Sequence, residues 1–158
     1  MKLRKAKKED FEEYYKLEVE YTKYNNSLEK EKKLRYKVVK TEQKKSFLKN
    51  LKKRNKLFLV LEEEGNLFGY LYGTIEKGAY PGYRSGVKKL GYLENIYVSK
   101  KIRAKGFGRK LIDEYLKFLK ENKIQYVFLH AVIPNKIALE FYKKLKFTPI
   151  EYKMMKKI

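Results

Sequence analysis

The residues with the clearest chemical meaning lie between Leu93 and Leu111, in the run LENIYVSKKIRAKGFGRKL. Gly106 and Gly108 stand among lysines and arginines, directly before an amphipathic helical pattern. The first N–H groups of a helix have no partner within it, and the helix dipole adds partial positive charge there. Glycine also lets the backbone approach a ligand closely. The stretch is therefore predicted to be an anion cradle, most often used for phosphate.

Two familiar glycine-rich nucleotide motifs do not fit this stretch. The Walker motif needs Gly-x4-Gly-Lys-Ser/Thr, and the dinucleotide fingerprint needs three glycines where this run has two. A turn that merely joins a strand to a helix, and binds nothing, is the alternative.

The composition narrows the classes of function. The chain has 158 residues, no cysteine and one histidine, so we expect a single domain over residues 1–158 without disulfides, a thiolate nucleophile or a metal site. Apolar runs stay short of the roughly 18 residues of a membrane span. The first ten residues, MKLRKAKKED, contain no hydrophobic signal core, so a cytoplasmic location is expected.

The net charge of +21 has two explanations. A basic surface attracts polyanions, so nucleic acid or the ribosome is a possible partner. Lysines are spread along the whole chain rather than gathered in a tail, which is also typical of a lysine-rich composition bias.

Hydrophobic periodicity predicts alternating strands and helices. Strands are expected at 2–6, 57–61, 67–75, 93–98, 126–133 and 148–155. In the strand 93–98, Leu93, Asn95 and Tyr97 are expected to alternate with Glu94, Ile96 and Val98. Helices are expected from Lys8 to a break at Asn25, from Thr41 to near Asn55, after Gly108, and from Asn135 to Leu145. A loop over 77–88 carries Tyr80, Tyr83 and Arg84, which either line an acceptor site or simply pack.

This order predicts a mixed α/β fold with helices on both faces of the sheet. The hairpin of 57–61 and 67–75 is antiparallel, as is most of the sheet. Strands 93–98 and 126–133 are joined through a helix and should form one central parallel pair with a right-handed crossover.

Two motifs resemble the GNAT (GCN5-related) N-acetyltransferase family. Arg103-x-x-Gly106-x-Gly108 after a strand resembles the acetyl-CoA pyrophosphate loop of that family. The pattern from Asn135 through Phe141-Tyr142 to Phe147 resembles its N-x-x-A-x-x-F-Y-x-x-x-G-F helix, with Lys146 in the place of the usual glycine. Within the family, the chain looks most like the diamine (spermidine/spermine) and thialysine acetyltransferases.

The resemblance implies acetyl-CoA as co-substrate and assigns roles to individual residues. Ile96, Tyr97 and Val98 would lie along the pantetheine arm and acetyl group, and Asn135 would hold that arm from the other side. The pyrophosphate would be wrapped by Arg103, Ala104, Lys105, Gly106, Phe107, Gly108 and Arg109.

Two further residues would carry the chemistry. Glu94 matches the carboxylate that related enzymes use as a base, which an acceptor amine needs because its pKa of about 10 leaves it protonated. Tyr142 would protonate the departing thiolate. Each has a plainer alternative: Glu94 as a solvated strand residue, Tyr142 as a core aromatic and Asn135 as a helix cap. His130 is expected to be structural rather than a base.

The leading hypothesis is therefore an N-acetyltransferase that joins acetyl-CoA and a primary amine in a ternary complex. The acceptor is a small amine, such as a polyamine or amino acid, or a protein amine; a homodimer is possible. A non-catalytic nucleic-acid- or ribosome-binding protein on the same scaffold is the alternative from another class, and an acyl-CoA sensor is a third.

Overall fold

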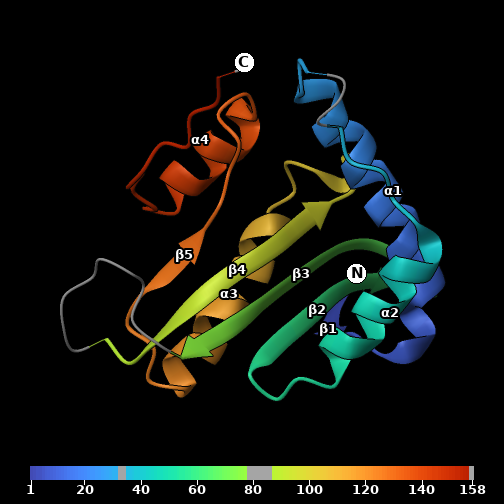
Figure 1. Ribbon diagram of the computed structural model, residues 1–158. Helices are drawn as coiled ribbons and strands as arrows, with labels where there is room; N and C mark the ends of the chain where they lie inside the picture. Colours follow the sequence, from blue (N-terminus) through green and yellow to red (C-terminus); the bar gives the residue numbers. More distant parts are fainter. Residues whose placement is uncertain (32–34, 78–86, 157–158) are drawn as a thin grey trace.

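The computed structural model describes residues 1–31, 35–77 and 87–156 (Figure 1). Its strands are β1 (Lys2–Lys5), β2 (Lys56–Glu63), β3 (Asn66–Lys77), β4 (Lys89–Val98) and β5 (Val127–Leu129). Its helices are α1 (Phe11–Leu28), α2 (Lys40–Leu51), α3 (Phe107–Glu121) and α4 (Lys136–Lys144), with short 3-10 turns at Lys8–Asp10 and Lys100–Ile102.

The sheet has the order β1-β2-β3-β4-β5. The first four strands pair antiparallel, and β4 pairs parallel with β5. The predicted mixed sheet, its hairpin and its one parallel pair are therefore confirmed. The predicted central position of that pair is wrong: β5 is an edge strand, because residues 148–155, which were expected to add a further strand, do not form one. The helix α3 connects β4 to β5, as a parallel pair requires.

Helices cover both faces of this sheet (Figure 1). On one face, α1 and α2 pack aromatic side chains such as Tyr14 and Phe47 against Phe58 and Tyr70. On the other face, α3 packs Leu111 and other apolar residues against the aliphatic side of the strands. The apolar face expected for α3 comprised Leu111, Ile112, Tyr115, Leu116 and Leu119. It is confirmed for four of these residues, which are buried, whereas Leu116 is half-buried.

A β-bulge in β4 changes the expected alternation. Leu93 lies opposite Gly73 and Asn95 lies opposite Tyr72, so Glu94 is the extra residue. Leu93, Ile96 and Val98 therefore contact the core beneath α3. The side chains of Glu94 and Asn95 instead reach groups on the α1 and α2 side, namely Lys56 and Tyr70. The simple alternation predicted for 93–98 was wrong at this point.

The C-terminal part of the chain departs furthest from expectation. The strand predicted for 126–133 is shortened to Val127–Leu129, which is only half-buried. The closing strand predicted for 148–155 does not form, and Ile150, Tyr152 and Met154 are exposed. Pro149 within this segment lacks the N–H that a strand ladder would use.

Helix boundaries also shifted where side chains bond across the fold. The break predicted at Asn25 is absent, and α1 continues to Leu28. Asn26 uses its side-chain amide to bond both backbone groups of Tyr36, at 2.8 Å each, so a residue typical of a turn is held within the helix. The helix α2 begins at Lys40 and ends at Leu51, four residues before the predicted end.

Candidate functional site

The glycine turn between β4 and α3 has the backbone geometry of an anion cradle. Gly106 caps α3 with φ of 80°, and Ala104 also has a left-handed φ of 62°. No side chain in the described part of the chain caps this helix, and its first internal hydrogen bond runs from Lys110 N–H to the Gly106 carbonyl. The N–H groups of Phe107, Gly108 and Arg109 therefore precede the internal ladder and are free to bind an anion.

The space in front of Gly106 is open. A Cβ built at this position would meet no atom within 4 Å, so a phosphate has room to approach the backbone. Lys105 and Arg109 are exposed beside it and add positive charge. Gly108 is different, because a Cβ there would come within 3.2 Å of the Phe141 ring. Gly106 thus serves the ligand side of the turn, whereas Gly108 permits close packing of α4 on α3.

The sheet opens next to this cradle. Pairing between β4 and β5 ends at Leu93, so β4 continues through Val98 without β5 beside it. The N–H of Ser99 bonds to the carbonyl of Phe68 in β3 at 2.8 Å. Since N–H groups alternate along a strand, the N–H of Val98 faces the opposite edge, toward β5. This edge offers backbone groups from Ile96 to Val98 to an extended ligand.

Arg103 does not extend over the cradle. Its Nε donates to the carbonyl of Val98 at 2.9 Å. Its guanidinium lies over the rings of Tyr24 and Tyr97, at 5.1 and 5.3 Å from their centroids. The arginine therefore fastens the turn to the end of β4 and to α1, and its binding to pyrophosphate stays a prediction.

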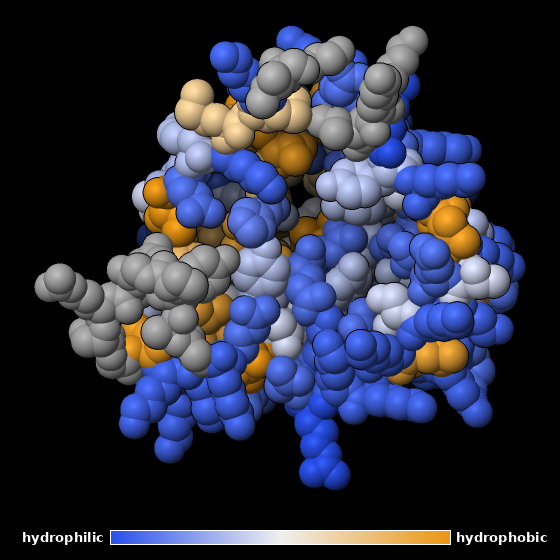
Figure 2. Space-filling view, viewed as in Figure 1, coloured by the Kyte–Doolittle hydropathy of each residue, from blue (hydrophilic) through white to orange (hydrophobic). Residues whose placement is uncertain are grey.

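Asn135 links α4 to α1 across the opening. Its Oδ1 accepts from Ala138 N–H at 3.1 Å, which caps α4, and from the Tyr24 hydroxyl at 3.0 Å. The capping role is thus present, and the predicted contact with the pantetheine arm stays a prediction. Figure 2 shows a hollow near this place, between α4 and the end of α1.

Tyr142 lies on the inner side of α4. Its ring packs at the edge of the core beneath α3 and contacts Phe147 edge-on, with centroids 5.7 Å apart. Burial, together with the nearby Tyr21, raises its pKa well above the ordinary value. The phenol therefore stays protonated at neutral pH, as a proton donor must, although the same burial fits a purely structural role.

Glu94 is held by a lysine that sequence reasoning did not single out. The ammonium of Lys56, at the start of β2, lies 2.5 Å from Glu94 Oε1, 3.0 Å from Asn50 Oδ1 and 5.1 Å from the Tyr72 ring centroid. The Lys56 side chain is only 2% exposed, whereas that of Glu94 is 29% exposed. Burial lowers the pKa of Lys56, and the hydrogen bond to Glu94 opposes this effect. Solvent can still reach the carboxylate.

The other residues singled out in the sequence are Tyr97, His130 and three residues of the 77–88 loop. Tyr97 is buried on the α1 side and donates to Glu20 at 3.2 Å; burial and the charge of Glu20 raise its pKa to about 12. His130 is exposed, bonds the Tyr92 hydroxyl and lies 3.8 Å from Glu151, away from the apolar strand expected for it. Tyr80, Tyr83 and Arg84 lie outside the described residues.

Within residues 1–31, 35–77 and 87–156, no three His, Cys, Asp or Glu side chains are grouped to hold a metal ion. No helix there combines the length and apolarity needed to cross a membrane.

Comparison with known proteins agrees with this geometry. Residues 5–147 match the model of the acetyltransferase (GNAT) family. An N-alpha-acetyltransferase of Sulfurisphaera tokodaii is 30% identical over 112 residues, which cover 66% of this chain. The same match spans 64% of the archaeal relative, so over a third of that protein has no counterpart in the alignment.

Solved structures share the fold. A tetramutant of the BH1408 protein from Bacillus halodurans superposes with a TM-score of 0.88 at 17% identity, covering 100% of both chains. The aminoglycoside N-acetyltransferase AAC(6')-Iy in complex with CoA gives a TM-score of 0.73 at 15% identity, covering 99% of this chain and 98% of the other.

Proposed function

Because the chain belongs to the GNAT family of acetyltransferases, we propose that it is an acetyl-CoA-dependent N-acetyltransferase acting on the N-terminal α-amine of polypeptides. The family supports the reaction, and the archaeal N-alpha-acetyltransferases support the acceptor. The earlier resemblance to diamine and thialysine acetyltransferases makes a small amine the competing acceptor. The net charge of +21 disfavours a polycation such as a polyamine.

One observation carries the proposal: β4 parts from β5 at Leu93 and leads directly into the open cradle at Gly106. A ligand with a diphosphate at one end and an extended amide arm at the other fits this arrangement. Its phosphates would meet the N–H groups of Phe107, Gly108 and Arg109. Its arm would run along the free edge of β4, which places a thioester near Val98.

The chain's own groups then serve a direct transfer. Acetyl-CoA supplies the activated acetyl group as a thioester. The N–H of Val98 faces the opened edge and would stabilise the oxyanion that forms when the amine attacks the thioester carbon. Glu94 has Oε1 paired with Lys56, so Oε2 is the oxygen to take the amine proton through water. As the carbon–sulfur bond breaks, Tyr142 would protonate the thiolate.

An acceptor screen tests this function. Release of free CoA would be followed with acetyl-CoA and a set of peptides, polyamines, amino acids and aminoglycosides. We expect turnover with peptides that have a free N-terminus and none with the same peptides acetylated at the N-terminus but carrying internal lysines. Turnover confined to small amines would overturn the acceptor assignment.

The same preparation tests the alternative function. A nucleic-acid- or ribosome-binding protein without catalysis would retain RNA in a salt-dependent way and release no CoA with any acceptor. The polyanionic partner and the homodimer both stay predictions, because the family and the fold support neither.

A further inference from the structure

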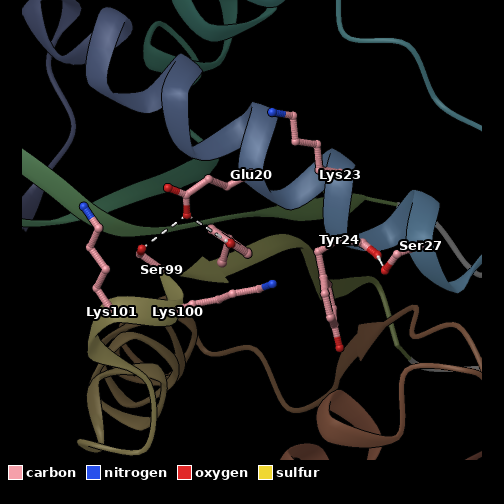
Figure 3. A pocket seen from close by; sticks show the side chains of 8 residues that line it. Glu20, Lys23, Tyr24, Ser27, Ser99, Lys100 and Lys101 are labelled. Atoms are coloured by element: carbon pink, nitrogen blue, oxygen red, sulfur yellow. Dashed lines mark hydrogen bonds between the residues drawn. The ribbon is translucent and has the colours of Figure 1, made fainter.

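A cavity of about 340 Å³ lies between the second half of α1 and the segment that follows β4 (Figure 3). From α1 it is lined by Glu20, Lys23 and Tyr24, among others. From the other side it is lined by Lys100 and Lys101, which directly follow Ser99. The cavity adjoins the site described above, because Tyr24 donates to Asn135 and the hydroxyl of Tyr97 donates to Glu20.

The cavity is predominantly cationic. In Figure 3 the three lysine side chains surround the carboxylate of Glu20. That carboxylate is fixed by the hydroxyls of Tyr97 and Ser99, each at 3.2 Å. Within the described residues, none of the three ammonium groups has a carboxylate within 4.0 Å. Clefts lined by one sign of charge concentrate ligands of the opposite sign.

The cavity lies beside the proposed acetyl site, on the face of β4 that carries α1. Tyr97 turns its ring toward α1, where it contacts Tyr21 edge-on at 5.7 Å. Val98 turns its side chain toward the core under α3. Ser99 lines the cavity and follows Val98 directly. The cavity therefore begins one residue from the proposed acetyl site at Val98.

From this arrangement we infer that the cavity selects acceptors by charge and takes peptides whose second residue is Asp or Glu. The inference rests on the proposed function. One extended residue spans about 3.3 Å, which matches the step from Val98 to Ser99, so the second side chain falls over the lysines. The lysines attract its carboxylate and repel a second ammonium group. Glu20 gives the acceptor's own ammonium a counter-charge as it approaches.

The acceptor's carboxylate is not the one anion that could bind these lysines. The 3′-phosphate of CoA is also an anion near the cradle and is a second candidate for Lys100 and Lys101. If the lysines bind the acceptor, their removal changes the ratio of rates with acidic and neutral peptides. If they bind the 3′-phosphate, their removal lowers the affinity for acetyl-CoA. Acetyl-CoA and its 3′-dephospho analogue are the probes that distinguish them.

The experiment uses three peptides that differ only at the second residue, with Asp, its neutral isostere Asn, or Lys. The wild type is compared with the double variant Lys100→Gln/Lys101→Gln. The control Lys52→Gln/Lys53→Gln removes the same charge from two adjacent exposed lysines at the end of α2. kcat/KM is measured for each peptide, and the Kd of both cofactors is measured by calorimetry.

We expect the wild type to prefer the Asp peptide over the Asn peptide by about tenfold, equivalent to about 1.4 kcal/mol. The cavity variant should lose most of this preference, act normally on the Asn peptide and bind both cofactors as before. The control should keep the preference. Raising the salt concentration should weaken the preference in the wild type, because exposed charges are screened.

Equal rates with the Asp and Asn peptides in the wild type would overturn the inference. So would a variant that loses affinity for acetyl-CoA but not for the dephospho analogue, which would assign the lysines to the 3′-phosphate. If no peptide is acetylated, the proposed function fails separately. Calorimetry of the same peptides on the CoA-saturated protein then decides whether the cavity still prefers the acidic one.

Discussion

The ion pair of Glu94 and Lys56 has two separable roles to test, in stability and in catalysis. The lysine is almost fully buried, and among residues 1–31, 35–77 and 87–156 its carboxylate partner is Glu94, at 2.5 Å. Removing one member of a buried ion pair leaves the other charge unsatisfied. Both Glu94→Gln and Lys56→Met should therefore lower the melting temperature, whatever the reaction requires.

Glu94→Gln should in addition lower turnover at neutral pH while leaving acetyl-CoA affinity unchanged. The loss should shrink at high pH, because free amine accumulates near its pKa of about 10 and no longer needs a base. A pH–rate profile beside a melting curve measures both effects. Wild-type turnover at pH 7 in a folded Glu94→Gln protein would remove Glu94 from the mechanism.

Tyr142 calls for a similar comparison. The substitution Tyr142→Phe keeps the ring that packs on Phe147, so the fold should survive. Loss of a general acid should reduce kcat by roughly 10²- to 10⁴-fold. Tyr115→Phe is the control, because its buried hydroxyl donates to the Thr74 carbonyl at 3.1 Å and should matter for stability only. A normal kcat in Tyr142→Phe would leave this tyrosine a structural role alone.

Among the elements, β1 and the start of α1 are tied together by Asp10. Two nitrogens of Arg4 donate to its carboxylate at 2.7 and 2.8 Å, and the N–H of Lys7 donates at 2.8 Å. Burial opposes the charge on Asp10, but the hydrogen bonds from Arg4 and Lys7 outweigh it and lower the pKa below its ordinary value of 3.8. Asp10→Asn should cost about 2 kcal/mol of unfolding free energy.

The pH dependence of that cost follows from the sign of the shift. A lowered pKa in the folded state contributes stability that is complete above the unfolded value and is lost as the pH falls through the folded value. Denaturant unfolding should therefore show a constant gap between wild type and Asp10→Asn above about pH 5, closing at lower pH. A gap that widens on acidification would contradict this account.

The C-terminal ends of α3 and α4 use lysine where glycine is usual. After α4, Phe147 N–H bonds the Tyr142 carbonyl and Lys146 N–H bonds that of Lys143, with Lys146 at φ of 65°. This is a Schellman motif, whose left-handed position normally holds glycine. The turn therefore keeps its usual geometry although Lys146 stands where the family's motif has glycine. Lys123 occupies the same position after α3, with φ of 59°.

Lys146→Gly and Lys123→Gly should each stabilise the protein by about 0.5–1 kcal/mol, since relief of the left-handed strain exceeds the entropy cost of glycine. Thermal unfolding measures the gain. Lys144→Gly, within the right-handed part of α4, should destabilise by about 1 kcal/mol. Equal effects at Lys144 and Lys146 would show that the strain is not the cause.

Sequence patterns predicted the fold well where one hydrophobic periodicity, such as that of a helix, continues over many residues. The stripe Leu111, Ile112, Tyr115 and Leu119 identified α3 and its buried face correctly. The bulge at Glu94 was hidden, because one inserted residue does not disturb the appearance of a short β-pattern. The segment 148–155 alternates like a strand, yet alternation says nothing about whether a neighbouring edge accepts it.

The site was predicted only in part, because the sequence shows local patterns but not contacts between distant segments. The glycine turn is local, so its cradle geometry follows from adjacent residues. The contacts Lys56–Glu94 and Tyr24–Asn135 join distant segments, the latter across 111 positions. In a chain with 40 lysines and arginines and 15 tyrosines, no signal marks one lysine or one tyrosine as the partner.

For the whole molecule, the central claim is that acetyl-CoA binds with its pyrophosphate on the turn at Gly106. The chain contains a matched control for this claim in Gly65, at the turn between β2 and β3. Both glycines have φ of 80°, and a Cβ at either would meet no atom within 4 Å. Valine at either position therefore introduces the same backbone strain, but only at Gly106 does it add bulk where phosphate must approach.

The most direct measurement is the Kd of acetyl-CoA, by calorimetry, for the wild type, Gly106→Val and Gly65→Val, each checked for folding by thermal denaturation. We expect similar losses of stability in the two variants. Gly106→Val should bind acetyl-CoA at least about tenfold more weakly, equivalent to about 1.4 kcal/mol, while Gly65→Val should bind it as the wild type does. Unchanged affinity in a folded Gly106→Val protein would contradict the account.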